Sequence, residues 1–225
     1  MRTSILSIFI FCFIIILSTS LYAVGLGIAF PYGTGNTDYD IYDADASQIG
    51  INFIFDTNVA KQSVFNYRLN VGVEFFNHDW EYEYYYYDYY YGYSSYDYMY
   101  GTNEGIRIVT DHTFGFGIVK SRVVRLWLGP TVRFGYITGD YAGITLGGGL
   151  TLLGLNFNMG PVFTLALEAG YLFDADIYFD GVEIDEYSYN AGTWVYESSD
   201  AGINNMFVAK LSILFRINDT YDDFF

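Results

Sequence analysis

Eight segments of the chain alternate apolar side chains with polar or small ones. In the clearest segment, residues 65–75, the apolar positions Phe65, Tyr67, Leu69, Val71, Val73 and Phe75 alternate with Asn66, Arg68, Asn70, Gly72 and Glu74. A period of two is that of a β-strand whose two faces meet different surroundings. The remaining segments are 22–32, 47–56, 106–118, 122–136, 143–152, 161–173 and 206–217. The pattern predicts an all-β chain of eight antiparallel strands.

The links between these segments fall into two length classes. The short links are 57–62, 119–121, 137–142 and 153–160, and the long links are 33–46, 77–105 and 174–203. Short turns at one end and longer loops at the other are typical of transmembrane β-barrels, whose closed ring leaves no strand edge unpaired in lipid. We therefore predict an eight-stranded, antiparallel, up-and-down transmembrane β-barrel with its apolar face towards lipid.

Three residues interrupt the alternation. Thr110 and His112 fall on the apolar face of their segment, and a β-bulge there would turn His112 inward. Pro130 also falls on an apolar position and has no N–H to donate, so a second bulge is expected there.

The first 23 residues have the pattern of an export signal. Arg2 precedes an apolar run from Ile5 to Ile16, and small residues follow that suit cleavage after Ser20 or Ala23. The only cysteine, Cys12, lies in this run, so the mature chain is expected to form no disulfide. The predicted organisation is a signal peptide at 1–23, an outer-membrane barrel at 24–217 and a periplasmic C-terminal tail at 218–225.

The export signal, the eight alternating segments and the long loops on one side together resemble the small eight-stranded outer-membrane barrels. That group includes the membrane domain of outer-membrane protein A, OmpX and the opacity-type surface proteins. The resemblance implies outer-membrane lipid and lipopolysaccharide as surroundings, and insertion by the barrel-assembly machinery. In this group a terminal Phe serves as the assembly signal; here either Phe215 or Phe225 fits that role.

Charge is sorted by position along the chain. There are 10 Lys and Arg against 26 Asp and Glu, a net charge of −16, which argues against nucleic acid as a partner. The outer loops contain no Lys or Arg but many acids, Asp174 and Asp176 among them. The predicted lumen charge network is Arg68, Glu74, Arg107, Asp111, Arg125, Arg133, Glu168, Lys210 and Arg216. A barrel of this size is filled by its side chains, so both a static polar plug and a narrow or gated pore with excess positive charge stay open.

The loop at 77–105 is dominated by tyrosine, which gives large contact area at low entropic cost. We predict a contact surface there for a host or environmental macromolecule, glycans included; the alternative is a low-complexity loop with no fixed partner. The residues assigned to this surface are Trp80, Tyr84, Tyr85, Tyr86, Tyr87, Tyr89, Tyr90, Tyr91 and Tyr93.

No enzyme, cofactor or specific metal site is expected. The two histidines, His78 and His112, lie in no recognisable catalytic pattern. The acidic stretch from Asp38 to Ser47 lacks the Gly and the distal Glu of an EF-hand, so diffuse bridging of divalent ions to lipopolysaccharide is favoured. The predicted function is a surface-exposed barrel with an adhesive or envelope-structural role. The alternatives are a small or gated pore, and a soluble secreted lipocalin-like protein, which would need its apolar face inward.

Overall fold

The computed structural model describes residues 24–40, 42–57, 64–88, 93–121, 123–188 and 193–217; side chains are described outside 82–99 and 183–198. The predicted signal peptide and the C-terminal tail lie outside these residues. The strands are β1 Val24–Tyr39, β2 Asp43–Asp56, β3 Phe65–Asp88, β4 Tyr93–Lys120, β5 Val124–Gly139, β6 Gly143–Met159, β7 Phe163–Ser188 and β8 Thr193–Ile217. Within the described ranges, no helix is long and apolar enough to cross a membrane.

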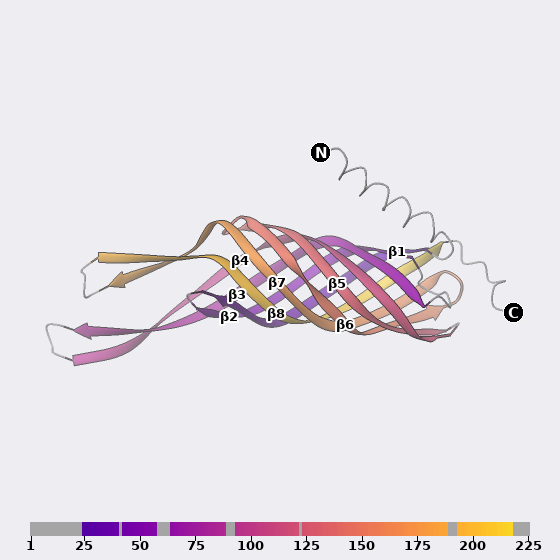
Figure 1. Ribbon diagram of the computed structural model, residues 1–225, viewed down its shortest axis with the longest axis horizontal. Coiled ribbons are helices and arrows are strands. Elements are labelled where there is room, and N and C mark those ends of the chain that lie inside the picture. Colours follow the sequence, from indigo (N-terminus) through magenta and orange to yellow (C-terminus); the bar gives the residue numbers. More distant parts are fainter. Residues whose placement is uncertain are drawn as a thin grey trace, which may run out of the picture.

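The strands form one closed ring. Each pairs antiparallel with the next, and β8 pairs with β1 from Val24↔Ile217 to Tyr39↔Gly202. Figure 1 shows the strands winding obliquely around a single axis. The predicted eight-stranded, antiparallel, up-and-down barrel is confirmed.

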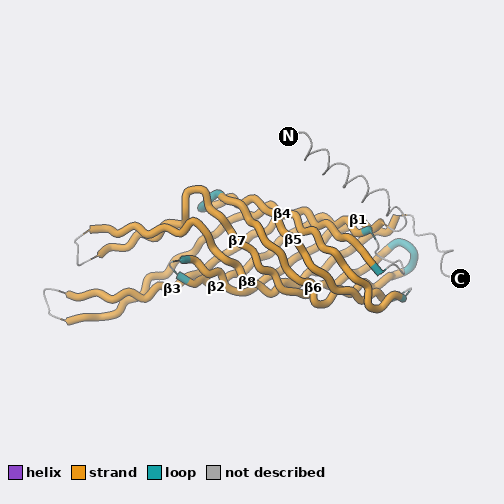
Figure 2. The backbone as a smooth tube through the Cα atoms, in the orientation of Figure 1, coloured by secondary structure: helices purple, strands orange, loops and turns teal. Residues whose placement is uncertain are grey.

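Two of the predicted long loops are instead hairpins that extend the barrel strands. β3 and β4 stay paired to Asp88↔Tyr93, and β7 and β8 to Ser188↔Thr193. Figures 1 and 2 show both hairpins projecting from the same end of the barrel, which we call the hairpin end. The apolar alternation stops in these segments because the hairpins have no buried face. Their many tyrosines nevertheless favour β-strands, and the two strands of each hairpin stay paired with each other. The third loop, 33–46, is also mostly strand, in β1 and β2.

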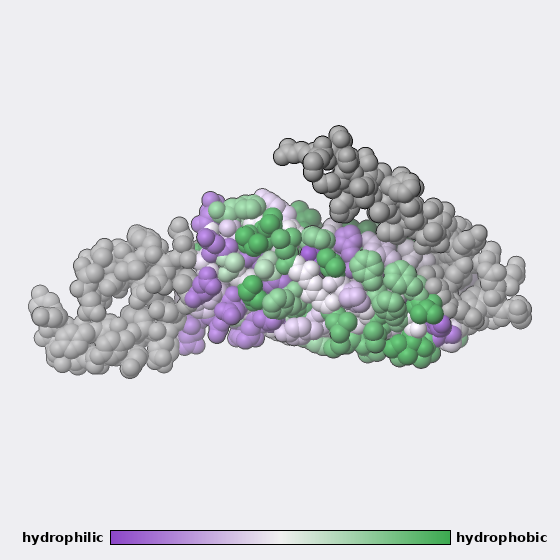
Figure 3. Space-filling model, viewed as in Figure 1, coloured by the Kyte–Doolittle hydropathy of each residue, from purple (hydrophilic) through white to green (hydrophobic). Residues whose placement is uncertain are grey.

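The barrel wall is apolar outside and polar inside. Ile49, Phe53 and Phe75 point outward and are 60%, 54% and 54% exposed, whereas Asn52 and Glu74 between them are buried. We call the outward apolar surface the apolar belt; its members include Ile28, Phe30, Tyr32, Ile49, Ile51, Phe53, Val71, Phe75, Ile108, Val132, Phe134, Leu150, Leu167, Phe207, Leu211 and Ile213. Figure 3 shows hydrophobic residues over the wall and hydrophilic residues gathered beside the hairpins.

The bulge predicted at His112 is wrong. Pairing on both sides of β4 runs without a shift from Thr110 to Thr113, so His112 stays on the outer face. There, the Tyr67 hydroxyl lies 2.7 Å from His112 Nδ1, and this hydrogen bond satisfies a ring nitrogen that would otherwise face the belt unpaired.

The bulge predicted at Pro130 lies instead in the neighbouring strand. Pro130 faces outward and pairs with Leu150 of β6. The register of the β5–β6 pair shifts between Trp127 and Gly129 of β5, because β6 has one extra residue opposite them. As a result, the consecutive residues Leu152 and Leu153 of β6 are both exposed. A β-bulge adds a residue in this way without turning the proline inward.

Candidate functional site

Among the residues whose side chains the structure describes, six bases and six acids point into the barrel. All nine residues that the sequence assigned to the lumen point inside. Among those that form ion pairs, Lys210 has the most exposed side chain, at 11%. Three further acids, Asp56, Asp174 and Asp176, are buried with them. The interior bases are Arg68, Arg107, Arg125, Arg133, Lys210 and Arg216, and the acids are Asp56, Glu74, Asp111, Glu168, Asp174 and Asp176. The formal charges therefore balance.

The assignment of Asp174 and Asp176 to an outer loop is wrong. β7 continues through both residues, and each alternates with an outward neighbour, so both side chains point into the barrel. Asp56 had no assignment. It lies two residues beyond Ile54 and four beyond Asn52, on the same inward face of β2. This even spacing from Asn52 could have predicted that Asp56 points into the lumen.

The ion pairs form three layers along the barrel. Farthest from the hairpins, Arg68 donates to Asp56 at 2.6 Å and also pairs with Glu168. Its guanidinium lies over the ring of Trp127, with 4.9 Å between Cζ and the ring centre. Trp127 is fully buried and donates to Asn156 Oδ1 at 3.3 Å. The buried side chains of this layer fill the lumen at the end of the barrel where β1 begins and β8 ends.

A glycine is required beside this tryptophan. A Cβ built on Gly154, in the adjacent strand β6, would lie 2.2 Å from an atom of the Trp127 ring. The ring therefore lies directly on the backbone of β6. A buried side chain that is held on both faces leaves no room for a larger residue.

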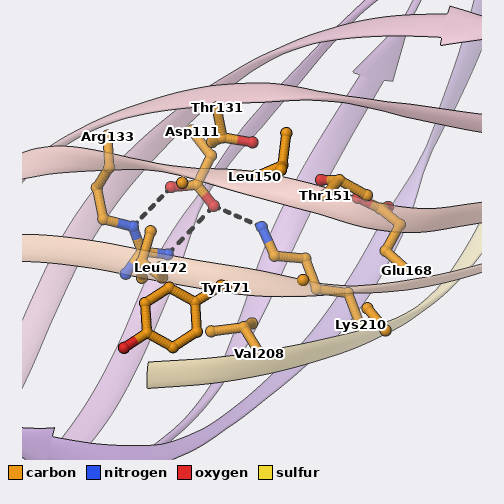
Figure 4. Close-up of a pocket in the computed structure, with 13 residues that line it drawn as sticks. Asp111, Thr131, Arg133, Leu150, Thr151, Glu168, Tyr171, Leu172, Val208 and Lys210 are labelled. Atoms are coloured by element: carbon orange, nitrogen blue, oxygen red, sulfur yellow. Dashed lines mark hydrogen bonds and ion pairs between the residues drawn. The ribbon is translucent and has the colours of Figure 1, made fainter. Parts of the chain in front are cut away.

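The middle layer centres on Arg133. Its guanidinium donates to both oxygens of Glu74, at 2.8 and 3.0 Å, and to both oxygens of Asp111, at 2.8 and 3.2 Å. Lys210 Nζ donates to Asp111 Oδ2 at 2.6 Å. Figure 4 shows Arg133, Asp111 and Lys210 linked around a small cavity of about 30 Å³. That volume suits one or two water molecules.

The third layer lies towards the hairpin end. Arg107 pairs with Asp176, which also accepts from Thr145 Oγ1 at 2.6 Å. Asn204 Nδ2 donates to Asp174 at 2.6 Å and to Asp176 at 2.8 Å. Arg107, Thr145 and Asn204 thus hold two adjacent carboxylates, and Arg133 of the middle layer lies 3.8 Å from Asp174.

A buried tyrosine–histidine cluster covers this layer. His78 lies beyond the apolar belt, between the outward residues Asn77 and Asp79. Arg107 donates to His78 Nε2 at 3.2 Å, so the ring proton belongs on Nδ1, which lies 2.6 Å from the Tyr39 hydroxyl. Burial and the Arg107 charge lower the pKa of His78 to about 3. With both nitrogens engaged and the ring neutral, His78 is poorly suited to act as a general base.

Aromatic side chains fill the lumen at the hairpin end. The buried cluster consists of Tyr39, Tyr42, Ala44, Phe76, Ile137, Tyr178 and Val182, with Trp80 and Tyr141 packed against it. Asn103 donates to the hydroxyls of Tyr39 and Tyr178 at 3.0 and 3.2 Å. Burial raises the pKa of Tyr39 far above its usual range. Sequence reasoning missed these residues because their partners come from distant strands.

The remaining predicted site residues lie as follows. Arg125 donates to Asn66 at 3.2 Å, and Arg216 donates to the Phe163 carbonyl at 3.4 Å. Trp80 is partly buried and lies against Tyr42 of the buried aromatic cluster, with 5.1 Å between ring centres. For Tyr84, Tyr85, Tyr86, Tyr87 and Tyr93 the structure describes the backbone only, in β3 and β4; Tyr89, Tyr90 and Tyr91 lie outside the described residues.

No family model and no curated protein sequence matches the chain. Among solved structures, it is similar to Neisserial surface protein A, with 10% identity and a TM-score of 0.35, over 87% of this chain and 98% of that one. It is also similar to outer membrane protease OmpT from Escherichia coli, with 9% identity and a TM-score of 0.37, over 87% and 96%. Both similarities are low, so the barrel assignment rests on the strand pairing of this chain.

Proposed function

We propose that the chain is a surface-exposed outer-membrane barrel with a closed lumen, whose acidic, tyrosine-rich hairpins bind a partner outside the cell. The observation that carries this proposal is that the polar and apolar residues lie opposite to their usual places in a soluble protein: ion pairs are buried inside, and an apolar belt is exposed outside. The hairpins then project from one rim of the membrane-spanning part.

The apolar belt supports insertion in a bilayer. Soluble monomers rarely expose contiguous apolar patches above a few hundred Å², whereas here bulky residues such as Phe53, Phe134 and Phe207 are each about half exposed around the ring. A lipocalin-like binder needs the opposite arrangement, with an apolar cavity inside. The described lumen is instead occupied by buried ion pairs and by tightly packed side chains.

The balanced interior supports a closed barrel over a pore. The excess of positive charge that favoured a pore disappears once Asp56, Asp174 and Asp176 join the lumen. Buried arginines fixed by two carboxylates, as at Arg133, are also expensive to displace. Purified protein in planar bilayers is therefore expected to show no steady conductance.

The hairpin register supports a contact surface for a basic partner. In the β3–β4 hairpin four acids have a tyrosine opposite: Glu81↔Tyr100, Glu83↔Tyr98, Tyr84↔Asp97 and Asp88↔Tyr93. Neither 77–105 nor 174–203 contains a Lys or Arg. Aromatic faces beside carboxylates attract ammonium and guanidinium groups through both cation–π and ionic contacts.

The test compares three surface-displayed forms: wild type, a Tyr-to-Ser set at Tyr84, Tyr85, Tyr96 and Tyr98, and an acid-to-amide set at Glu81, Glu83, Asp88 and Asp97. Cell binding to poly-lysine and to heparin surfaces is measured at equal outer-membrane levels. Both variants are expected to lose at least about tenfold of the poly-lysine binding, since each removes several contacts of roughly 0.5–1 kcal/mol.

Wild-type binding to heparin at least as strong as to poly-lysine would contradict the basic partner. Binding unchanged in both variants would contradict the contact surface itself. If the Tyr-to-Ser set alone keeps poly-lysine binding, the binding depends on net charge and tyrosine has no role in it.

A further inference from the structure

The cavity of about 30 Å³ in the lumen lies between two of the ion-pair layers. One side of it is lined by Lys210 of the middle layer, and another by Glu168, which pairs with Arg68 in the layer farthest from the hairpins. Gly149 and Gly170 also line the cavity and add no side chain to it, so the wall leaves space there. The cavity therefore separates two charged groups that belong to different layers.

Three polar side chains around this cavity have hydrogen-bonding capacity that the protein does not use. Thr151 is 8% exposed and lines the cavity, and no described residue forms a hydrogen bond with its hydroxyl. Lys210 Nζ has three N–H groups, of which one donates to Asp111 at 2.6 Å. Glu168 pairs with arginine through Oε1, so Oε2 remains able to accept. Figure 4 shows these side chains around one space. Burying polar groups without a partner is unfavourable, which points to a bound ligand.

The charges around the cavity determine what kind of ligand fits. Lys210 and Glu168 lie directly opposite each other in the β7–β8 register, yet no ion pair joins these two described side chains. An anion in the cavity would lie beside the carboxylates of Asp111 and Glu168, and a cation would lie beside the Lys210 ammonium. Both contacts are unfavourable at short range in a low-dielectric interior. The site therefore fits a neutral molecule that both donates and accepts hydrogen bonds.

We propose that one or two ordered water molecules occupy this cavity and bridge Lys210, Thr151 and Glu168. Water accepts from the Lys210 ammonium, donates to Glu168 Oε2 and hydrogen-bonds to the Thr151 hydroxyl. A buried water makes about three hydrogen bonds, and about 30 Å³ has room for one or two of them. The bridge joins the Arg133 layer to the Arg68 layer, so their ion pairs form one hydrogen-bonded network. This inference does not depend on what the hairpins bind.

The direct test is a crystal structure of the intact mature protein, grown in parallel from chloride and from bromide solutions. We expect density for one or two waters within about 3.2 Å of Lys210 Nζ and of Thr151 Oγ1. The anomalous signal of bromide should be absent from the cavity. An empty cavity, or a bromide peak inside it, would overturn the inference.

The variant Thr151→Val tests the same site in solution, because a bound water and a dry cavity predict effects of opposite sign. In a dry cavity the hydroxyl has no partner, so valine of similar size should raise the folding equilibrium constant. With water bound, valine removes one hydrogen bond of the bridge and should lower the constant about three- to tenfold. Urea titration in lipid vesicles measures this constant.

The matched control is Thr110→Val, which removes a hydroxyl from the outer face of β4 and should leave the folding equilibrium constant unchanged or higher. A constant for Thr151→Val at or above that of wild type contradicts the inference, as does an equal decrease in the control. If the Thr151→Val protein does not refold, the wild-type crystal structure decides between water, halide and a dry cavity.

Discussion

Replacing Arg133 with methionine should lower the free energy of unfolding by about 3–5 kcal/mol. The variant removes the cation that pairs with the buried carboxylates of Glu74 and Asp111 and lies 3.8 Å from Asp174, while Lys210 still donates to Asp111. A buried charge without a partner is far more costly than a buried pair is stabilising. Urea titration in lipid vesicles, read by gel migration of the folded barrel, measures the change.

A second variant separates the ionic effect from lost packing. Arg133→Met/Glu74→Gln removes one charge of each sign and leaves the Asp111–Lys210 pair intact, so it should recover at least half of the lost stability. Lys120→Met, at the exposed end of β4, is the control and should change stability by less than about 0.5 kcal/mol. If Arg133→Met is as stable as wild type, or if the double variant is no better than the single one, the ionic account of the lumen is wrong.

Acidification from pH 6.5 to 3.5 should remove about 4 kcal/mol of stability that depends on His78. Its folded pKa of about 3 lies below the unfolded value of 6.5, so the unfolded chain binds the proton first. Stability from the neutral ring is therefore complete above pH 6.5 and declines by about 1.4 kcal/mol per pH unit as pH falls towards 3. Protonation would place a charge directly against Arg107.

The measurement is the free energy of unfolding of wild type and His78→Gln between pH 7.5 and 3.5. The variant has no histidine to protonate at this position, so its free energy of unfolding should fall less steeply with decreasing pH. The contribution of the buried carboxylates is common to both proteins and cancels when the two curves are subtracted. Parallel curves would show that the ring is not held neutral at the barrel mouth.

The alternation of apolar and polar residues was sufficient to predict the barrel wall. Each wall strand satisfies one rule over many residues, because lipid-facing and lumen-facing positions differ in hydropathy. The hairpins escape this rule, since neither face of a two-stranded extension is covered. Their strands therefore appeared as loop. Asp174 and Asp176 were also assigned to a loop, although β7 still pairs there with both β6 and β8.

Contacts across the barrel could not be predicted from the sequence. Arg68 meets Glu168, and Tyr39 meets both His78 and Tyr178, only because eight strands close with one particular register. The local sequence pattern predicts which face of the wall a residue occupies, but not its position along the barrel axis relative to residues of other strands. The same limit explains His112: its outward position is stable because Tyr67 of the adjacent strand supplies a partner.

Cysteine scanning of β2 tests most directly whether the outer face of the barrel meets lipid. The only cysteine of the chain, Cys12, lies in the predicted signal, so single cysteines can be placed one at a time from Ile49 to Phe55 and labelled with a fluorophore. In vesicles containing brominated lipid, labels at Ile49, Ile51 and Phe53 should be quenched, and labels at Gly50, Asn52 and Ile54 should not. Uniform quenching by aqueous iodide instead, or the opposite alternation, would contradict the account.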